Sequence, residues 1–482
     1  MSINSAFNSA FSGLTAAGRA SDIVAQNLAN ALNPAYARRS LSLGAGGDSV
    51  PGVKVNGVVR HADPGLLAVR RAADAENQSA GVKADFFTKM SGHVGTVDDQ
   101  FSIASRLADF DASTLEAASQ PDSMPRLSGL SVDAENLARS INDAAEGLRD
   151  IRSAADDSIG VQADSLNRTL KEVQKVNTRI TIAAAGGMST AALEDQRSEL
   201  IDQVNEMIPV NVVQRDGGKV ALFSQGGIVL LDGQAAELSF SSVKETMPNM
   251  TQANGLLSGL EINGIAIDTR SGGPLGNGTL AAQFEVRDEL AVEAQEDLDA
   301  MAMDLIQRFQ DPAMDATIGA TDPGLFTDGQ SHFDPANTTG IANRIELHDS
   351  VSMSGAAETW RLRDGLYAAA QGEAGNATLL NAYSDALSKT QTVSSVGLGS
   401  ADMDATTVSA SLLSRFAQDK VAADQALTFA NSSFAEAEQL ELGQGVDSDY
   451  ELQNLMLIEQ AYAANARMMT VVDELMQTLL RM

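Results

Sequence analysis

Two heptad-like patterns of apolar residues, one near each end of the chain, constrain the fold more than any other feature of the sequence. The N-terminal pattern has large side chains at its ends and small ones in its middle: Phe7, Phe11, Leu14, Gly18, Ser21, Ala25, Leu28 and Leu32. The C-terminal pattern comprises Leu455, Ile458, Tyr462, Asn465, Met469, Val472, Met476 and Leu479. Spacings of three and four residues place each set on one helix face. We therefore predict that the first and last helices pair in a coiled coil.

Local signals predict where these two helices begin and end. Pro34 disfavours helical backbone in the residue before it, so the first helix is expected to end at Asn33. Ser448 and Glu451 fit a capping box, in which the serine accepts from a backbone N–H and the glutamate reaches back. The small residues in the middle of the N-terminal pattern would let another backbone approach closely. A single amide in an apolar seam, here Asn465, typically fixes the register of pairing.

Between the two ends, helical and strand-like patterns alternate in blocks. Helical spacing predicts helices over 82–120, 126–185, 193–207, 287–311, 376–396 and 402–440, with Gly147 and Gly160 as candidate interruptions of the second. Short β-rich runs separated by glycine turns fill residues 210–290, and 53–59 and 341–347 also read as strands. This order predicts a mainly α fold with an inserted antiparallel β domain.

The same blocks predict three domains. We expect a terminal coiled-coil domain of residues 1–60 with 441–482, a helical domain of 61–208 with 290–440 that surrounds it, and a β-rich outer domain of 209–289. Because all other blocks lie between the two terminal helices, their pairing brings the ends of the chain side by side. Stacked copies would then form a column of coils.

The charge balance argues against nucleic acids and lipid bilayers as partners. The 482 residues include 33 Lys and Arg against 64 Asp and Glu, a net charge of −31, which phosphate backbones and anionic membranes repel. Arg38-Arg39 and Arg70-Arg71 are isolated pairs of the kind usually found on solvated faces. The sequence also lacks an uninterrupted apolar run of about 18 residues. We therefore expect no nucleic-acid binding and no membrane insertion.

Residue types that catalyse reactions or bind metals are present but not grouped. The histidines at 61, 93, 332 and 348 are scattered, and none forms the i, i+4 pair of a helical metal site. The chain has no cysteine, which excludes disulfides and thiolate ligands. Residues 272–278 lack the Lys-Ser/Thr of a phosphate loop, and 315–334 lack the spacing of a calcium loop. We predict no catalytic, metal-binding or cofactor-binding residues, and no enzyme activity.

Both ends resemble the signatures of the flagellar rod, hook and hook-associated proteins. The N-terminal matches are 10–17 (AFSGLTAA), 26–31 (QNLANA) and 34–39 (PAYARR), and the C-terminal matches are 453–467 (QNLMLIEQAYAANAR) and 473–480 (DELMQTLL). Within this superfamily, residues 195–201 (DQRSELI) and 278–288 (GTLAAQFEVRD) resemble the hook-associated protein 1 family, the junction proteins between hook and filament. Ala35 stands where the superfamily usually has glycine, and the chain is somewhat short for the hook-associated protein 1 family, so we expect a changed turn and a reduced outer region.

The resemblance implies a structural subunit of the bacterial flagellum that assembles through its terminal helices at the hook–filament junction. The implied partners are further copies of the chain in a junction ring, the hook protein, the next hook-associated junction protein, and a cytoplasmic export chaperone on the C-terminal helix. Residues 1–12 do not read as a signal peptide. Secretion to the extracellular flagellum would then use the flagellar type III apparatus without a cleaved signal peptide. Alternatives are another axial component of hook or rod type, or a secreted helical effector that sets the same seams against lipid.

The expected assembly interface combines the two apolar patterns with positions of the matched motifs. Its residues are Phe7, Phe11, Leu14, Ala25, Asn27, Leu28, Asn30, Leu32, Tyr36, Leu455, Ile458, Tyr462, Asn465, Met469, Val472, Met476 and Leu479. One such helix buries too little apolar surface to offset the conformational entropy lost on ordering it. We therefore predict that both ends are mobile in the free chain and become ordered on assembly.

Overall fold

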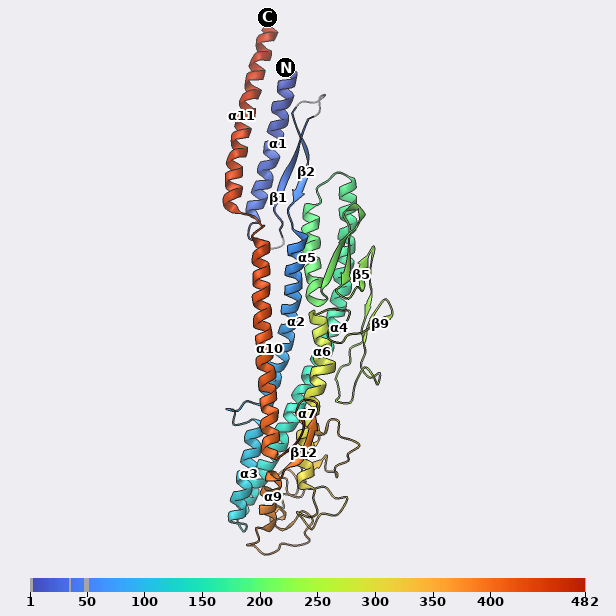
Figure 1. The fold of residues 1–482 in the computed structure, drawn as a ribbon, viewed down its shortest axis with the longest axis vertical. Helices are drawn as coiled ribbons and strands as arrows, with labels where there is room; N and C mark the ends of the chain where they lie inside the picture. The colour runs from blue at the N-terminus through green and yellow to red at the C-terminus, as the bar shows by residue number, and fades with distance from the viewer. Residues whose placement is uncertain (1–2, 34–35, 47–51, 482) are drawn as a thin grey trace.

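The protein forms an elongated molecule in which both ends of the chain lie at the same pole (Figure 1). The computed structural model describes residues 3–33, 36–46 and 52–481. Its elements fall into two parts, which we call the terminal module and the body. The terminal module contains α1 (Ile3–Ala29), the strands β1 (Arg39–Ala45) and β2 (Val53–Arg60), and α11 (Ser448–Arg481). The body comprises the elements from α2 (Pro64–Val94) to α10 (Ala405–Leu442).

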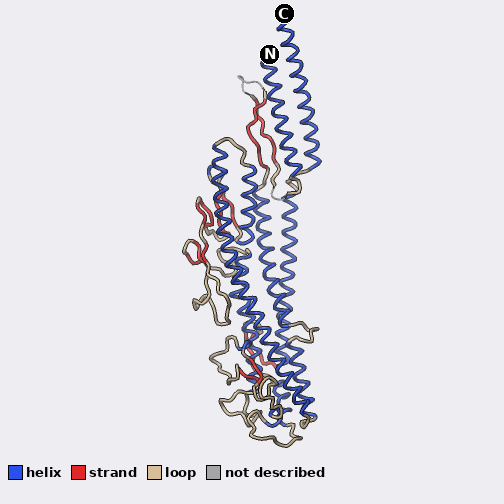
Figure 2. The backbone as a smooth tube through the Cα atoms, turned by 180° about the vertical axis from the view of Figure 1, so that it is seen from behind, coloured by secondary structure: helices blue, strands red, loops and turns tan. Residues whose placement is uncertain are grey.

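The terminal module confirms the predicted pairing of the first and last helices. α1 and α11 lie side by side, and the antiparallel hairpin of β1 and β2 packs along α1 (Figures 1 and 2). The predicted end of the first helix is wrong, because α1 stops at Ala29 rather than Asn33. The N–H of Asn30 is shared between the carbonyls of Gln26 and Asn27, and the chain then continues in tighter turns. Pro34 and Ala35, on which two predictions rested, lie outside the described residues.

The predicted helix over 82–120 is in fact two helices, and the first begins much earlier. α2 starts at Pro64, because Asp63 caps it by accepting from the N–H of Gly65 at 2.7 Å. Gly95, with a φ of 88°, ends α2 in a conformation that favours glycine. Ser102 then caps α3 (Ile103–Ser119).

The longest helix, α4 (Met124–Ala185), runs without a break for 62 residues. Gly147 and Gly160 do not interrupt it, contrary to the candidate role given to them above. At Gly147 the ring of His93 occupies the space that a Cβ atom would need, so this glycine allows α2 and α4 to cross closely. α4 contributes Leu127 to Ala155 to one apolar cluster and Ile159 to Val173 to a second.

The first apolar cluster joins α4 to the other helices at the pole far from the termini. Phe110, Phe309 and Phe326 meet there edge to face, with ring centroids 5.3–5.7 Å apart. The cluster also includes apolar side chains of the irregular segment 311–375, in which β10 and β11 pair. Besides residues of α2, α3, α4 and α10, it includes residues of α7 (Ala291–Phe309), β10 (Phe326–Asp328), β11 (Ile345–Leu347), α8 (Arg361–Asp364) and α9 (Thr378–Ser388). The strand predicted over 341–347 is confirmed only in its second half, since Ile341–Asn343 is a 3₁₀ turn.

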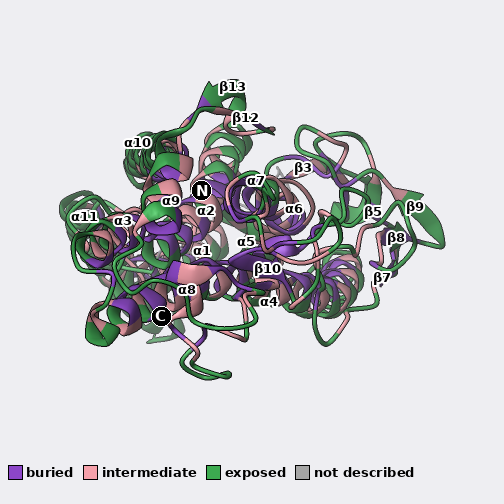
Figure 3. Ribbon diagram, turned by 90° about the horizontal axis from the view of Figure 1, so that it is seen from below, coloured by how far each residue is buried: buried purple, intermediate pink, exposed green. Residues whose placement is uncertain are grey.

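The second apolar cluster lies beneath the inserted β elements and confirms the predicted antiparallel insertion. One sheet contains β3 (Val210–Gln214), β4 (Val220–Ser224), β5 (Val229–Asp232) and β6 (Gln234–Ala235). The other contains β7 (Leu238–Ser239), β8 (Leu260–Ile262) and β9 (Ile265–Ile267). Both sheets contribute to the cluster, together with α4, α5 (Ala191–Met207) and α6 (Thr279–Glu285). Figure 3 shows this insertion on the opposite side of the molecule from α10 and α3.

The prediction of one helix over 376–396 is wrong at its C-terminal end. α9 ends at Ser388, and the next residues form β12 (Gln391–Ser395), which pairs with β13 (Gly399–Met403). Lys389 takes an extended conformation, and Val393 on β12 is buried in the first apolar cluster. Burial of this side chain in a hairpin therefore prevails over continuation of the helix. α10 then begins where Asp404 accepts from the N–H of Thr407.

Candidate assembly interface

The predicted residues of α1 lie mostly on its exposed side. Phe7 and Phe11 are 39% and 56% exposed, and their rings lie nearly parallel with centroids 6.4 Å apart. Ala25 and Leu28 are also exposed, Leu14 and Asn30 are half-buried, and Leu32, just beyond the helix, is 98% exposed. The buried side of α1 consists instead of Ala10, Ala16, Ala17, Ile23, Val24 and Asn27. α1 therefore packs within the subunit through smaller side chains than the predicted seam.

α11 buries even less of its surface than α1. Of its 34 residues, only Glu451 and Val472 are buried in the described chain. Leu455, Ile458, Asn465 and Met469 are half-buried, whereas Tyr462, Met476 and Leu479 are exposed. Further apolar side chains on the same helix are open to solvent, among them Leu457 at 64% and Leu480 at 83%. Figure 3 shows α11 at the periphery with most of its surface exposed. The pair of helices thus carries apolar surface that the subunit itself does not cover.

The closest approach of the two helices occurs at Gly13. A Cβ atom on Gly13 would lie 2.7 Å from Nδ2 and 2.9 Å from Cγ of Asn465, so the asparagine side chain lies directly against the glycine backbone. The amide of Asn465 also donates to the carbonyl of Ala461 at 3.0 Å. Gly18 has open space where its Cβ would be. The sequence pattern therefore predicted a close approach of small residues but placed it one to two turns too late.

A buried amide fixes the chain where it leaves α1. Asn27 is fully buried, and its Nδ2 donates to the carbonyl of Arg39 at 2.8 Å. Its Oδ1 accepts from the Tyr36 hydroxyl at 2.8 Å and from the N–H of Arg39 at 3.0 Å. The Arg39 guanidinium lies 4.6 Å from the centre of the Tyr36 ring. Two predicted interface residues, Asn27 and Tyr36, are therefore engaged within the subunit, where they position Arg39.

The predicted capping box at the start of α11 is wrong. Asp447 caps this helix, because its carboxylate accepts from the N–H groups of Asp449 and Tyr450 at 2.9 and 3.1 Å. Glu451 instead pairs with Arg38 at 2.8 Å, and its side chain is only 1% exposed. This hydrogen bond raises the pKa of Arg38. A contact between the hairpin strand and α11 therefore replaces the expected local cap.

Arg39, Arg70 and Arg71, from the two arginine pairs that resembled solvated faces, instead bind carboxylates on one face of α5, and Arg60 joins them. Asp195 pairs with Arg39 at 2.6 Å and with Arg60 at 2.7 Å. Two turns later, Asp202 pairs with Arg70 at 2.8 Å and with Arg71 at 2.6 Å. Asp195 and Asp202 belong to the motif 195–201 and its flank, which the sequence comparison singled out without a role. The residue spacing gave no sign of these partners, because they are distant in sequence.

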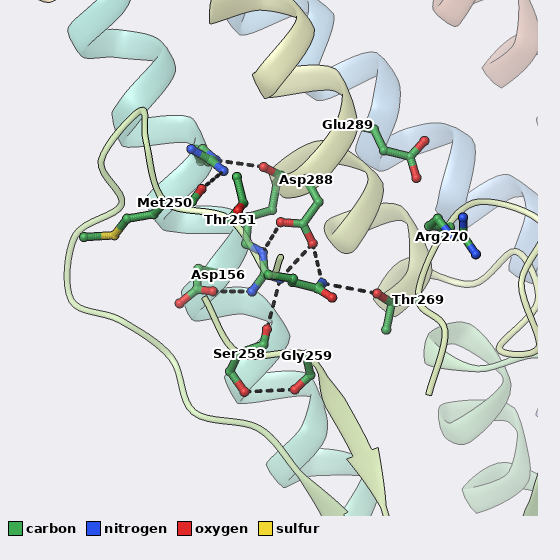
Figure 4. A network of polar contacts seen from close by, with 12 residues as sticks. Asp156, Met250, Thr251, Ser258, Gly259, Thr269, Arg270, Asp288 and Glu289 are labelled. Carbon is green, nitrogen blue, oxygen red and sulfur yellow. Dashed lines mark hydrogen bonds and ion pairs between the residues drawn. The ribbon is translucent and has the colours of Figure 1, made fainter. Parts of the chain in front are cut away.

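The second motif, 278–288, contains Arg287, one of the two arginines that are the largest fully buried side chains of the described residues. Its guanidinium pairs with Asp156 at 2.6 Å and with Asp288 at 2.7 Å, and donates to the carbonyl of Ser258 at 3.1 Å. Figure 4 shows these partners converging from α4, the loop before β8 and the π-helical turn Val286–Leu290. The ring of Phe284 lies 4.9 Å from the same guanidinium. This network joins the β insertion to α4.

The terminal helices leave apolar side chains exposed, and the described residues hold no group of metal ligands beside them. In the described part of the chain, no three histidine, aspartate or glutamate side chains are grouped as metal ligands. None of the helices described has the length and apolar character needed to cross a membrane. The terminal helices expose apolar side chains that no contact within the described part of the subunit covers.

Two protein-family models match the sequence. The helical domain of the flagellar hook-associated protein FlgK matches residues 90–315, and the C-terminal region of the flagellar basal body rod FlgEFG proteins matches residues 442–482. The first match contains α3 to α7 with the whole β insertion, and the second contains α11. Both motifs, with the partly buried ion pairs of Asp195 and the buried ion pair of Arg287 with Asp156, fall within the first match.

Individual relatives agree with these family models. Flagellar hook-associated protein 1 of Bacillus subtilis is 26% identical over 509 aligned residues, which cover 96% of this chain and 95% of that protein. The protein of the same name from Escherichia coli is 26% identical over 281 residues, which cover 56% of this chain and about half, 51%, of that protein. A solved structure of the flagellar hook junction protein FlgK from Burkholderia pseudomallei aligns with a TM-score of 0.44 at 18% identity, over 54% of this chain and 47% of that one.

Proposed function

Because the chain belongs to the family of flagellar hook-associated protein 1, we propose that it is a structural subunit at the junction between the flagellar hook and filament. The family consists of structural flagellar components, which agrees with the predicted lack of enzyme activity. In this proposal the subunit self-assembles through its terminal helices.

The observation that supports self-assembly is the exposed apolar surface of α1 and α11. Phe11, Leu457 and Leu480 are 56%, 64% and 83% exposed on helices that together bury few residues within the subunit. Apolar side chains concentrated on one paired-helix module favour burial against identical modules of neighbouring copies. The body has two apolar clusters of its own, whereas neither cluster includes a described side chain of α1 or α11.

The proposed interface keeps the residues predicted from the sequence, with different roles for some of them. Phe7, Phe11, Leu28, Tyr462, Met476 and Leu479 would contact neighbouring copies directly, because they are exposed. Asn27, Tyr36 and Asn465 would make contacts inside the subunit, and these contacts would stabilise the conformation of the module that binds a neighbouring copy. The corresponding domains are residues 1–60 with 441–482 at the axis, 61–208 with 290–440 around them, and 209–289 outermost.

The proposed partners follow from a place at the junction. They are further copies in a ring, the hook protein on one side and the next hook-associated junction protein on the other. A cytoplasmic chaperone would cover the C-terminal helix before export, since that helix exposes apolar side chains in the single chain. The proposed location is the extracellular flagellum. The match of residues 442–482 to rod proteins leaves an axial role of hook or rod type as the second candidate.

The proposal is tested by replacing the exposed aromatic pair in the cell that makes the protein. We expect the double variant Phe7→Ser/Phe11→Ser to be exported but to leave hooks without filaments in electron micrographs. The matched control is Val161→Ser/Ile182→Ser, which alters two α4 side chains that are 67% and 63% exposed in the body. The control should bear normal filaments. Normal filaments on the Phe7→Ser/Phe11→Ser cells would contradict assembly through this face, and loss of rods or hooks would favour the second candidate.

A further inference from the structure

The terminal module is joined to the body by two short segments, and no described module side chain belongs to either apolar cluster of the body. The segments are 61–63, between β2 and α2, and 443–447, between α10 and α11. Each apolar cluster consists of body residues, from Phe86 to Phe416 in the first and from Ile159 to Phe284 in the second. Among the described residues, neither cluster includes a side chain from α1, the hairpin or α11. Apolar packing therefore does not determine the angle between module and body.

A single carboxylate on the body accepts bonds from two hairpin residues and from the residue two places before the hairpin. Asp195 of α5 accepts from Arg39 Nη2 at 2.6 Å, from Arg60 Nε at 2.7 Å and from the N–H of Ala37 at 3.4 Å. The three side chains are 13–16% exposed, so water and salt reach these ion pairs less than they reach a surface pair. Charge-assisted bonds of this kind are short and directional, which suits them to fixing an orientation.

The two arginines would repel each other without this carboxylate. Arg39 and Arg60 are directly opposite one another in the antiparallel register of β1 and β2. Like charges at directly opposed positions destabilise a sheet pair, so the negative charge of Asp195 stabilises the hairpin as well as its contact with α5. Arg39 is also held on the module side, because the side chain of Asn27 in α1 accepts from the N–H of Arg39 and donates to its carbonyl.

The residue before Arg39, Arg38, links this part of the chain to the other terminal helix. Arg38 pairs with Glu451 of α11, while Arg39 pairs with Asp195 of α5. Neighbouring residues of an extended segment point to opposite sides, so one short stretch joins α11 and the body. A change at Asp195 is therefore transmitted to both terminal helices through a few polar bonds.

We propose that Asp195 is a latch that sets the orientation of the terminal module relative to the body. With the latch closed, the module holds one angle. With it open, the hairpin and the end of α1 bonded to it through Asn27 pivot about the segments that join the module to the body, 61–63 and 443–447. This inference concerns the isolated chain and does not depend on the proposed function.

The absence of native cysteines allows a direct test in the full chain. We would place spin labels at Lys54→Cys on β2 and Lys171→Cys on α4, both exposed positions, and measure the distribution of distances between them. We expect a narrow distribution with Asp195 and one more than twofold wider with Asp195→Asn. Asp195→Glu, which keeps the charge, should preserve the narrow distribution.

Asp202→Asn is the matched control. Asp202 lies on the same face of α5 and binds two arginines in the same way, but both belong to α2 and therefore to the body. Its substitution should leave the distance distribution unchanged. Circular dichroism would establish that each variant keeps its helix content. An unchanged width in folded Asp195→Asn, or equal broadening in Asp202→Asn, would overturn the proposal.

Discussion

Asn465 of α11 lies against the backbone of Gly13 in α1, with its Nδ2 2.7 Å from the position of a Cβ atom on the glycine. No larger residue fits at position 13 unless the two helices move apart or the asparagine side chain turns away. The pair therefore defines the register in which the terminal helices meet. This is the role that the sequence suggested for Asn465, now with a specific partner.

This register predicts the outcome of a disulfide experiment. The chain has no cysteine, so the double variant Gly13→Cys/Asn465→Cys has only two thiols. Because the two positions are in contact, these thiols lie close enough to form a disulfide. We expect this variant to oxidise at least about tenfold faster than Gly18→Cys/Asn465→Cys, since Gly18 has no atom within 4 Å of its Cβ position. Peptide mapping by mass spectrometry would detect the bond. Equal rates, or a bond only between two chains, would contradict this pairing within the subunit.

The exposure of α11 predicts rapid amide exchange in the free chain. With only Glu451 and Val472 buried, this helix lacks the packing that most helices of globular proteins need for stability. We expect residues 448–481 to exchange within seconds in dilute solution and to become protected on assembly. Residues 124–185 of α4 serve as the internal reference, because that helix is buried along much of its length. Strong protection of both segments in dilute solution would contradict the prediction.

The buried network around Arg287 predicts a large loss of stability when the arginine is removed. Arg287→Ala leaves the fully buried carboxylate of Asp156 without its ion partner, which should lower the free energy of unfolding by about 3–5 kcal/mol. Urea unfolding followed by circular dichroism measures this change. In the control Arg270→Ala, the lost pair with Asp268 involves an arginine side chain that is 80% exposed, and the midpoint should not move. A similar small effect in both variants would show that the network contributes little.

A carboxyl on α7 predicts a specific pH dependence. Burial raises the pKa of Asp299 above 3.8, although the N–H groups of Gly340 and Ala342 donate to it at 2.7 and 2.9 Å. Because the folded chain then binds this proton more readily than the unfolded chain, the contribution of Asp299 to the free energy of unfolding increases as the pH falls through the raised pKa. Asp299→Asn lacks this contribution.

We therefore expect the stability of wild type minus that of Asp299→Asn to increase from about pH 7 to about pH 4.5, measured by urea unfolding at each pH. Asp268 provides the contrast, because its hydrogen bond from Arg270 lowers its pKa to about 2. Its contribution is present above the ordinary value and is lost only as the pH falls toward about 2. The difference for Asp268→Asn should stay flat over the same window. A flat difference for Asp299→Asn as well would refute the assignment.

Periodic sequence patterns predicted the helices and strands in which apolar residues recur on one face. The terminal helices and α4 show regular apolar spacing, and the strands between Val210 and Ile267 are separated by glycine turns, so both were visible without partners. The start of α2 was missed although its signal was present, since Asp63 precedes a proline at the first helical position. β12 was mistaken for helix because Val393 is buried against the first apolar cluster, whose residues are distant in sequence, and this burial favours a hairpin with β13.

The functional surface was only partly predictable, for a related reason. The sequence showed that α1 and α11 are apolar. It did not show which face of each helix packs inside the subunit, because that depends on the close approach of Gly13 and Asn465. Glu451 looked like a local cap, because its partner Arg38 lies 413 residues away in the sequence. Asp195, too, bonds to arginines 135 and 156 residues distant. Spacing along one helix carries no information about such contacts.

α4 has a mechanical consequence, because one unbroken helix belongs to both apolar clusters. At a rise of about 1.5 Å per residue, its 62 residues extend over about 93 Å. A torque applied to the helices at one pole is therefore carried past the β insertion by a covalent backbone and its hydrogen bonds. Because α4 contributes to both apolar clusters, the two halves of the body cannot rotate independently of each other. A twist of the molecule is therefore concentrated in segments 61–63 and 443–447, next to the hairpin.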